Sequence, residues 1–267
     1  MKSSKIWFKG LLLAVALNFT GAAAVHAEDL LQSVKASGVL KIGLEGTYPP
    51  FGYRDSAGKL DGFDVAVAKA VATRMGLKPV FVTTEWSGII AGLQAGKFDV
   101  IVNQVSITPQ RQQVLDFTPP YAYSSAQLIE RTSDKRNFKS LADLKGKKVG
   151  VSLGSNFADL AHSEPGVIVK TYPGAPETLS DLADGRIDAS INDRLMLPYL
   201  IKTSHLPLRT GALLNGAKFE MGIPFRKGNP AFAKAIDDAV SSLRQDGTLR
   251  KLSMQWFGTD VSQPIAQ

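Results

Sequence analysis

Short apolar runs alternate with longer amphipathic runs along this 267-residue chain, and this alternation is the feature that most limits its fold. The first half contains strand-like runs at residues 40–44, 78–82 and 98–102, separated by runs with helical spacing at residues 60–76 and 87–97. Strands that alternate with helices are joined by crossover connections. The pattern therefore predicts an α/β fold with a mainly parallel sheet.

Capping residues predict where these two helices begin and end. Asp61 is a candidate N-cap for the first helix, and Gly76 is placed to stop it. For the second helix, Ser87 is the expected start and Gly96 the expected end. Apolar side chains recur at three- and four-residue spacing in the first helix, which predicts that one of its faces is buried.

The same pattern repeats in the second half of the chain. A short helix capped by Ser140 comes first. We expect the next elements at residues 147–153 (strand), 154–161 (helix), 177–185 (helix), 187–193 (strand) and 194–201 (helix). Two helices that meet at Gly247 end the chain without a further strand, so they are expected to pack back on the first unit.

This organisation predicts two α/β lobes, each a mixed sheet flanked by helices, because about 240 residues are long for one compact core. Lobe 1 is expected to comprise residues 28–121 and 223–267, and lobe 2 residues 126–217. The chain then crosses between the lobes in two hinge strands, at 122–125 and 218–222. A cleft at the interface of two lobes is a common place for a small ligand.

Residues 1–27 have the composition of a secretory signal peptide. Three lysines precede the apolar run from Leu11 to Leu17, and small residues lead to a cleavage point before Glu28. The alternative is a membrane anchor, which needs ~20 consecutive apolar residues, and polar residues interrupt this run earlier. The chain has no cysteine, so it offers no disulfide and no attachment point for the lipid of a lipoprotein. We therefore expect a protein released into the periplasm.

Charge and composition argue against several classes of function. The net charge of +7 includes three lysines of the predicted signal, which leaves 28 basic and 24 acidic residues, about +4. No basic run with interleaved aromatic residues is present, so the sequence does not predict nucleic-acid binding. His162 and His205 lack the spacing of metal ligands, and we expect neither a metal nor a cofactor. A monomer is expected, because no pattern demands a partner surface.

Polar side chains follow the predicted strands of the first unit, at the edge where ligands bind in open α/β sheets. Arg111 comes after the strand at 98–102 and a turn rich in Ser and Thr. Its planar, permanently charged group suits a carboxylate held by two parallel hydrogen bonds. The alternative is an ordinary surface arginine in the first turn of a helix that Thr108 caps. The residues alone leave both interpretations open.

Seven motifs follow one another along the chain: GTYPPF, GFDVAVA, LQAGKFDVIVNQVSITPQR, DFTPPY, LKGKKVGVSLGS, GRIDASIND and QDGTLRKLSMQWFG. Together they resemble the extracellular solute-binding proteins of polar amino-acid ABC importers, over nearly all of the chain after the predicted signal. The resemblance implies a type II periplasmic-binding-protein fold whose two lobes close on an amino acid. It also implies delivery of that amino acid to a permease in the inner membrane.

The resemblance assigns four residues to the α-carboxylate of the amino acid. Arg111 matches the arginine that grips the carboxylate, and Ser106 matches the hydroxyl residue that helps it. Ser155 and Asn156 match the turn whose backbone amides close over the carboxylate at a helix N-terminus.

Five further residues are assigned to the α-ammonium group and the side chain of the ligand. Asp193 matches the acid that pairs with the ammonium, although it could instead cap the helix that follows it. Gln104 lies where a backbone carbonyl usually meets the ammonium. Tyr48 and Trp86 match residues on the two sides of the ligand side chain, with core aromatics as the alternative. Glu45 falls where relatives read that side chain, unless it is a solvated loop acid.

The ligand is expected to be L-cystine, with another polar amino acid as the alternative. GLEGTYPPF, NQVSIT, SLGSN and NDRL are more similar to the cystine-binding branch of the family than to its histidine, basic or glutamine branches. Tyr48 and Trp86 could hold a disulfide through sulfur–aromatic contacts. Arg194 is a candidate partner for the distal carboxylate.

Two rival functions stay open. One is an enzyme on the same scaffold, such as a prephenate-type dehydratase, with Glu45, Glu85 or Asp193 as the general acid. Against it, Arg111 and Asp193 together form a site for a zwitterion, and a dicarboxylate would leave Asp193 unpaired. The other is a sensor subunit that presents its closed lobes to a membrane receptor. We expect a binding protein and not an enzyme.

Overall fold

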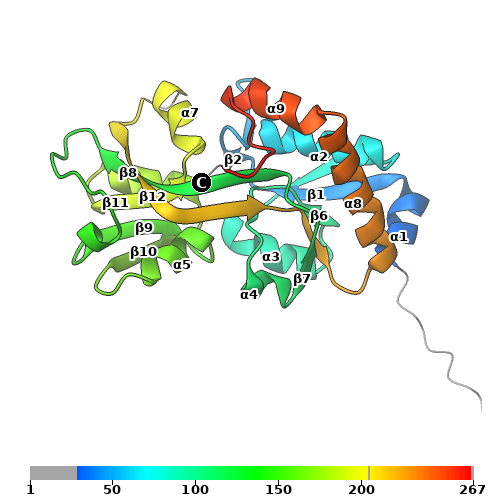
Figure 1. The fold of residues 1–267 in the computed structure, drawn as a ribbon, viewed down its shortest axis with the longest axis horizontal. Coiled ribbons are helices and arrows are strands. Elements are labelled where there is room, and N and C mark those ends of the chain that lie inside the picture. Colours follow the sequence, from blue (N-terminus) through cyan, green and yellow to red (C-terminus); the bar gives the residue numbers. More distant parts are fainter. Residues whose placement is uncertain (1–28, 204, 266–267) are drawn as a thin grey trace, which may run out of the picture.

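The computed structural model describes residues 29–203 and 205–265. These residues form two lobes, each built around a five-stranded sheet flanked by helices (Figure 1). The predicted signal peptide, residues 1–27, lies outside the described residues. None of the described helices is long and apolar enough to cross a membrane. The two-lobed α/β fold predicted from the alternation of strands and helices is confirmed.

The sheet of the first lobe is mixed and has the strand order β5-β1-β6-β13-β7. Its strands are β1 (Val39–Leu44), β5 (Lys78–Thr83), β6 (Val100–Ile101), β7 (Leu115–Phe117) and β13 (Pro224–Arg226). β1 pairs in parallel with β5 and β6, whereas β13 is antiparallel to β6 and β7. The helices of this lobe are α1 (Leu30–Ser37), α2 (Phe63–Arg74), α3 (Trp86–Gln94), α4 (Pro109–Gln112), α8 (Pro230–Gln245) and α9 (Thr248–Phe257). Helices α8 and α9 pack on α2, so the end of the chain returns to this lobe (Figure 1).

The sheet of the second lobe has the order β10-β9-β11-β8-β12. Its strands are β8 (Ala122–Arg131), β9 (Lys148–Ser152), β10 (Ile168–Tyr172), β11 (Ala189–Asp193) and β12 (Leu208–Met221). β9 is parallel to β10 and β11, and β8 is antiparallel to β11 and β12. The helical segments are η1 (Ala142–Leu144), α5 (Asn156–His162), α6 (Ala175–Ala183) and α7 (Met196–Thr203).

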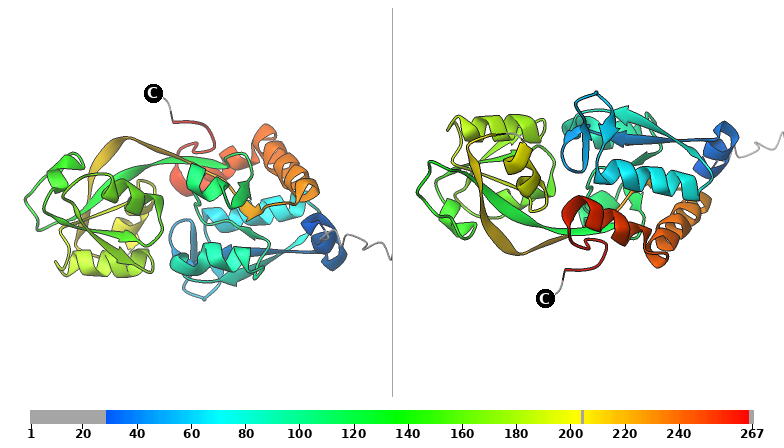
Figure 2. Two further views of the ribbon diagram at one scale, coloured as in Figure 1. Left: turned by 90° about the horizontal axis from the view of Figure 1, so that it is seen from below. Right: turned by 90° about the horizontal axis from the view of Figure 1, so that it is seen from above.

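Two long strands, β8 and β12, connect the lobes (Figure 2). They pair antiparallel where the chain crosses, from Ala122 opposite Met221 to Ser125 opposite Lys218. Sequence analysis missed the length of β12, because its glycines and asparagine are typical of turns. The strand tolerates them through two register shifts, between Thr210 and Lys218, which are β-bulges or similar irregularities.

A small three-stranded sheet follows β1 and was not predicted. It consists of β2 (Thr47–Tyr48), β3 (Gly52–Arg54) and β4 (Leu60–Asp61). It places Tyr48 in front of the carboxyl end of β1, at the border with the second lobe.

The predicted N-cap of the first helix is wrong. Asp61 belongs to β4, and its carboxylate accepts a hydrogen bond from the backbone of Gly62 at 2.9 Å. Gly62 is the N-cap, with a φ of 129°. A Cβ at this position would lie 2.3 Å from the carbonyl oxygen of Phe51, so only glycine fits.

Four other helix starts also differ from the predicted ones, and one of them is α6, which begins at Ala175 and not at residue 177. Helix α3 begins at Trp86 with Glu85 at the N-cap, one residue before the predicted Ser87. The 3-10 turn η1 begins at Ala142, because Asp143, and not Ser140, accepts the backbone hydrogen bonds at this turn. Helix α7 begins at Met196 and not at residue 194, since the chain first turns around Asp193. In each case a tertiary or side-chain contact overrides the local signal.

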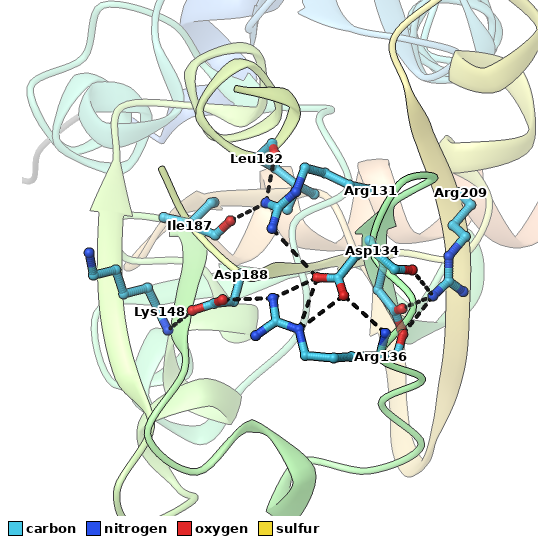
Figure 3. A network of polar contacts seen from close by, with 9 residues as sticks. Arg131, Asp134, Arg136, Lys148, Leu182, Ile187, Asp188 and Arg209 are labelled. Atoms are coloured by element: carbon cyan, nitrogen blue, oxygen red, sulfur yellow. Dashed lines mark hydrogen bonds and ion pairs between the residues drawn. The ribbon is translucent and has the colours of Figure 1, made fainter. Parts of the chain in front are cut away.

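An ionic network holds the end of the second lobe that lies away from the other lobe (Figure 3). Arg136 bonds Asp134 at 2.6 Å and Asp188 at 2.8 Å, and Arg131 joins the same network. Arg209 pairs with the fully buried Glu130. The network therefore ties β8, β12 and the start of β11 together.

Replacing Asp134 with Asn should lower the free energy of unfolding at neutral pH, because Arg136 loses its charged partner. The expected loss is only about 1 kcal/mol, since the network is partly exposed to solvent. Hydrogen bonds from Arg136 lower the pKa of Asp134 from 3.8 to about 2. The stabilisation is therefore present above the unfolded-state pKa and is lost as the pH falls through about 2.

Urea unfolding of wild type and variant at pH 7 and at pH 2 measures this difference. Asp238, in an exposed pair with Lys234, is the matched control, and its replacement by Asn should change little. If the difference in free energy of unfolding between wild type and Asp134→Asn were the same at both pH values, the prediction would be contradicted.

Candidate functional site

A cleft with an empty volume of about 350 Å³ lies between the lobes. The first lobe lines it with Glu45, Tyr48, Trp86, Asn103 and Gln104, and the second with Ser152, Ser155, Asn156, Phe157, Ala175 and Asn192. Six of the nine predicted site residues are in this lining, from both lobes. The other three, Arg111, Ser106 and Asp193, lie next to the lining residues through contacts described below.

The topology explains why these side chains meet. Glu45 directly follows β1, Asn103 and Gln104 follow β6, and Asn192 is near the end of β11. Carboxyl ends of parallel strands lie on one edge of a sheet, and these edges of the two sheets face one another.

Arg111 bridges the two lobes. From α4 it donates through Nη1 to the carbonyl of Ser106 at 2.9 Å and through Nη2 to the carbonyl of Gly154, in the second lobe, at 3.1 Å. Its guanidinium carbon lies 5.4 Å from the ring centre of Trp86. Burial lowers the pKa of Arg111 to about 10, so it is charged at neutral pH. Within residues 29–203 and 205–265 no carboxylate forms an ion pair with it.

Asp193 is a buried carboxylate with one free oxygen. Oδ1 accepts hydrogen bonds from Ser124 Oγ at 2.6 Å and from the backbone of Leu195 at 2.8 Å. Oδ2 is buried and has no hydrogen-bond partner in the part of the chain that the structure describes. Burial raises the pKa of Asp193 to about 6. One oxygen thus shapes the turn before α7, and the other is buried without a donor.

Tyr48 and Trp86 both line the cleft and both pack in hydrophobic clusters. The hydroxyl of Tyr48 donates to Asn192 Oδ1 in the second lobe at 2.6 Å, and its ring lies 5.0 Å from that of Phe51. The core role and the cleft position, which the sequence presented as alternatives, are combined in each residue.

Glu45 is buried, with 9% of its surface exposed, so the alternative of a solvated loop acid is wrong. Oε2 accepts from Asn103 Nδ2 at 2.8 Å. Burial is the main cause that raises the pKa of Glu45 to about 7; the hydrogen bond from Asn103 opposes this shift, and the charge of Glu177, in the first turn of α6, adds to it. A Cβ placed on Gly174 would lie within 3.5 Å of a carboxylate oxygen from each of these two acids, so they approach one another across the cleft.

The remaining predicted residues surround this constellation. Ser106 is fully buried, and its hydroxyl donates to the sulfur of Met221 at 3.4 Å. Ser155 is the N-cap of α5, where its hydroxyl accepts from the backbone of Ala158 at 3.1 Å. Asn156 has a buried Nδ2 without an acceptor in the described residues. Gln104 has a φ of 52°, a left-handed conformation that is rare outside glycine.

Sequence reasoning missed Asn103, Asn192 and Glu177. The two asparagines stand directly beside predicted site residues, so position along the strand end could have signalled them. Glu177 has no such signal, because only the packing of α6 against β2 brings this exposed acid near Glu45.

Residues 40–259 match the family model of the bacterial extracellular solute-binding proteins, family 3. The chain belongs to this family. The L-cystine-binding protein TcyJ of Escherichia coli (strain K12) is 39% identical over 98% of this chain and 100% of its own length. The L-cystine-binding protein TcyA of Bacillus subtilis (strain 168) is 39% identical over 88% of this chain and 87% of its own.

Among solved structures of similar proteins, an ancestral arginine-binding protein bound to arginine superposes with a TM-score of 0.78 at 36% identity. The similarity covers 83% of this chain and 99% of that one. Membership of the family agrees with the resemblance found in the sequence motifs and with the two-lobed fold.

Removing the hydroxyl of Tyr48 should favour the open arrangement of the lobes. The Tyr48→Phe variant loses the cross-lobe bond to Asn192, and one such bond is worth about 1 kcal/mol, or about a fivefold shift in the open–closed equilibrium. Spin labels on one cysteine introduced in each lobe measure the distance, since the chain has no other cysteine. Tyr172→Phe is the control, because its hydroxyl bonds Asp181 within the second lobe. Equal distance distributions in the two variants would show that the cross-lobe bond does not hold the lobes.

Proposed function

We propose that this chain is the substrate-binding component of an ABC importer, which captures L-cystine and delivers it to a membrane permease. The observation that carries the proposal is a pair of complementary groups from the two lobes. Arg111, without an acidic partner in the described residues, faces the second lobe, and Asp193 contributes a buried oxygen without a donor. An α-amino acid carries the carboxylate and the ammonium that complement both.

Closure follows from this arrangement of charges. The α-carboxylate of the ligand binds the guanidinium group of Arg111, with Ser106 and the turn at Ser155 and Asn156 beside it. The α-ammonium of the ligand pairs with Oδ2 of Asp193, with the backbone of Gln104 beside it. A ligand that touches both lobes binds the closed form better than the open form, so it shifts the population toward closure.

The other end of the cleft suits a second polar group. Glu45 and Glu177 bring two carboxylates together, and a distal ammonium such as that of L-cystine would relieve their repulsion. Asn156 offers an unpaired donor for an oxygen of the ligand. Tyr48 and Trp86 supply aromatic rings for the disulfide between the two ends. The names of two relatives at 39% identity, both L-cystine-binding proteins, support the same ligand.

The cellular setting in the proposal is the periplasm. Residues 1–27 would be removed as a signal peptide, and the mature chain would act as a monomer that reaches the permease in its closed form. Lobe 1 would then comprise residues 28–121 and 223–267, lobe 2 residues 126–217, and the hinges 122–125 and 218–222. The pairing of β8 with β12 across the two hinge segments supports this division.

Binding, rather than catalysis, is the proposed activity. The relatives named above are binding proteins. A dehydratase acting on a prephenate-like dicarboxylate would place no ammonium beside Asp193 and would leave that acid, together with Glu45, unpaired.

A thermal-shift screen of residues 28–267 against the common L-amino acids, L-cystine and prephenate tests the proposal. L-cystine at 100 times its dissociation constant should stabilise the chain by about 2.7 kcal/mol and raise the melting temperature. A shift with a different amino acid would keep the importer function and replace the ligand. Turnover of prephenate, or no shift with any amino acid, would contradict the proposed function.

The Arg111→Ala variant should bind L-cystine more than tenfold more weakly than wild type, because the α-carboxylate loses its charged partner. Isothermal titration calorimetry measures the dissociation constant, and circular dichroism checks that the fold survives. Arg250→Ala is the control, since Arg250 is exposed and its nearest acid, Asp260, lies 3.8 Å away on the surface. Wild-type affinity in the Arg111 variant would return this residue to the role of an ordinary surface arginine.

A further inference from the structure

A fully buried carboxylate, Asp64, lies directly behind the cleft residue Gln104 and has no part in the site described above. Asp64 is in the first turn of α2. Its Oδ1 accepts from Gln104 Nε2 at 2.7 Å and from the hydroxyl of Tyr121 at 3.0 Å. Its Oδ2 and the side-chain oxygen of Gln104, Oε1, are both buried, and neither has a partner among the described residues.

The two unpartnered atoms belong to the same pair of groups. An ionised carboxylate and an amide oxygen only accept hydrogen bonds, so neither can satisfy the other. A protonated carboxyl group has one O–H donor. A carboxyl group and a primary amide are both planar, and each presents a donor and an acceptor side by side, so the two groups can form two parallel hydrogen bonds. A proton on Oδ2 of Asp64 would supply the donor that Oε1 of Gln104 lacks, and with Nε2 donating to Oδ1 it would close a cyclic acid–amide pair that leaves neither atom unpaired.

We propose that Asp64 carries a proton in the folded protein and, through this cyclic pair, acts as a positioning residue that holds Gln104 for the amino acid. The inference rests on the proposed function, because Gln104 matters here as a residue of the ligand cleft.

The backbone of Gln104 explains why such a hold is needed. Its φ of 52° is rarely adopted by residues with a side chain and persists where the surroundings impose it. Tyr121 and Asp64 hold Gln104 through two hydrogen bonds. The backbone N–H of Gln104 donates to the hydroxyl of Tyr121 at 3.1 Å, and the side-chain Nε2 of Gln104 donates to Asp64. Two residues further on, the carbonyl of Ser106 accepts from Arg111. The conformation at Gln104 thus sets the direction of the loop that supports the predicted carboxylate partner.

The charges around Asp64 favour the neutral form. Burial is the main cause that raises its pKa to about 7, and the carboxylate of Asp193, from β11 of the other lobe, makes the smallest upward contribution to that value. The hydrogen bonds from Gln104 and Tyr121 lower it. Tyr48 also faces the carboxylates of Asp64 and Asp193. In the described part of the chain no Lys or Arg forms an ion pair with Asp64.

The sign of the pH dependence follows from the raised pKa. Between pH 3.8, the usual pKa of this carboxyl group, and about 7, the folded chain binds a proton that the unfolded chain has released. The contribution of Asp64 to stability is therefore fully present below pH 3.8 and is lost as the pH rises through about 7. If the pair positions Gln104, the affinity for the amino acid declines over the same rise.

Asparagine at this position is a permanent copy of the protonated acid. Its Oδ1 accepts from Gln104 Nε2, and its Nδ2 donates to Oε1 at every pH, whereas alanine removes both bonds. The experiment measures the dissociation constant of L-cystine and the melting temperature for wild type, Asp64→Asn and Asp64→Ala, at pH 5.5 and pH 8.5. Asp193, Glu45 and the ligand titrate in all three proteins, so the ratio of the dissociation constants of wild type and Asp64→Asn at each pH measures the effect of Asp64 together with its coupling to Asp193.

We expect wild type and Asp64→Asn to agree within about twofold at pH 5.5, and wild type to bind at least about fivefold more weakly than Asp64→Asn at pH 8.5. Asp64→Ala should bind more weakly than Asp64→Asn at both pH values. The melting temperature of Asp64→Asn should exceed that of wild type by a margin that widens with pH.

The inference would be overturned if the ratio of the dissociation constants of wild type and Asp64→Asn did not change with pH. It would also be overturned if Asp64→Asn bound L-cystine as weakly as Asp64→Ala. If wild type binds no amino acid at either pH, the proposed function fails. The melting temperatures then test separately whether Asp64 is protonated: a difference between Asp64→Asn and wild type that is the same at both pH values would contradict the acid–amide pair.

Discussion

The structure depends on charged groups that are buried at the border of two lobes without full pairing. Removing an ionised group from water is unfavourable unless it gains a partner. Arg111 has carbonyl partners but no carboxylate, and Asp193 keeps one oxygen without a donor, both within the described residues. A ligand with both charges would complete each partnership, and this is the physical basis of the proposal that the lobes close on an α-amino acid.

The fold gives each lobe one half of this arrangement. Parallel strands β1 and β6 lead into Glu45 and Gln104 on one side, and β11 ends at Asp193 on the other. In the proposed site neither half is complete alone, because each would contribute only part of the complement to a zwitterion. The paired strands β8 and β12 are the structural links that allow the two halves to meet. The far end of the second lobe is held by its own ionic network.

Much of this could be predicted from the sequence, because alternation and strand ends are local patterns. Residues that follow a predicted strand, such as Glu45 and Gln104, could be placed at the cleft, and the structure puts both in its lining. Contacts that depend on tertiary packing could not be predicted. Glu177 comes near Glu45 through the position of α6, and Gly62 replaces Asp61 as N-cap because Phe51 leaves no room for a side chain. The long strand β12 was hidden by turn-forming residues that its register shifts accommodate.

The most direct measurement is a crystal structure of residues 28–267 grown with L-cystine. The account predicts one molecule in the cleft, with an α-carboxylate on the guanidinium of Arg111 and the α-ammonium of the same end on Oδ2 of Asp193. Density for the ligand elsewhere, or in the cleft with these two groups untouched, would contradict the claim that the lobes close on the charges of an α-amino acid.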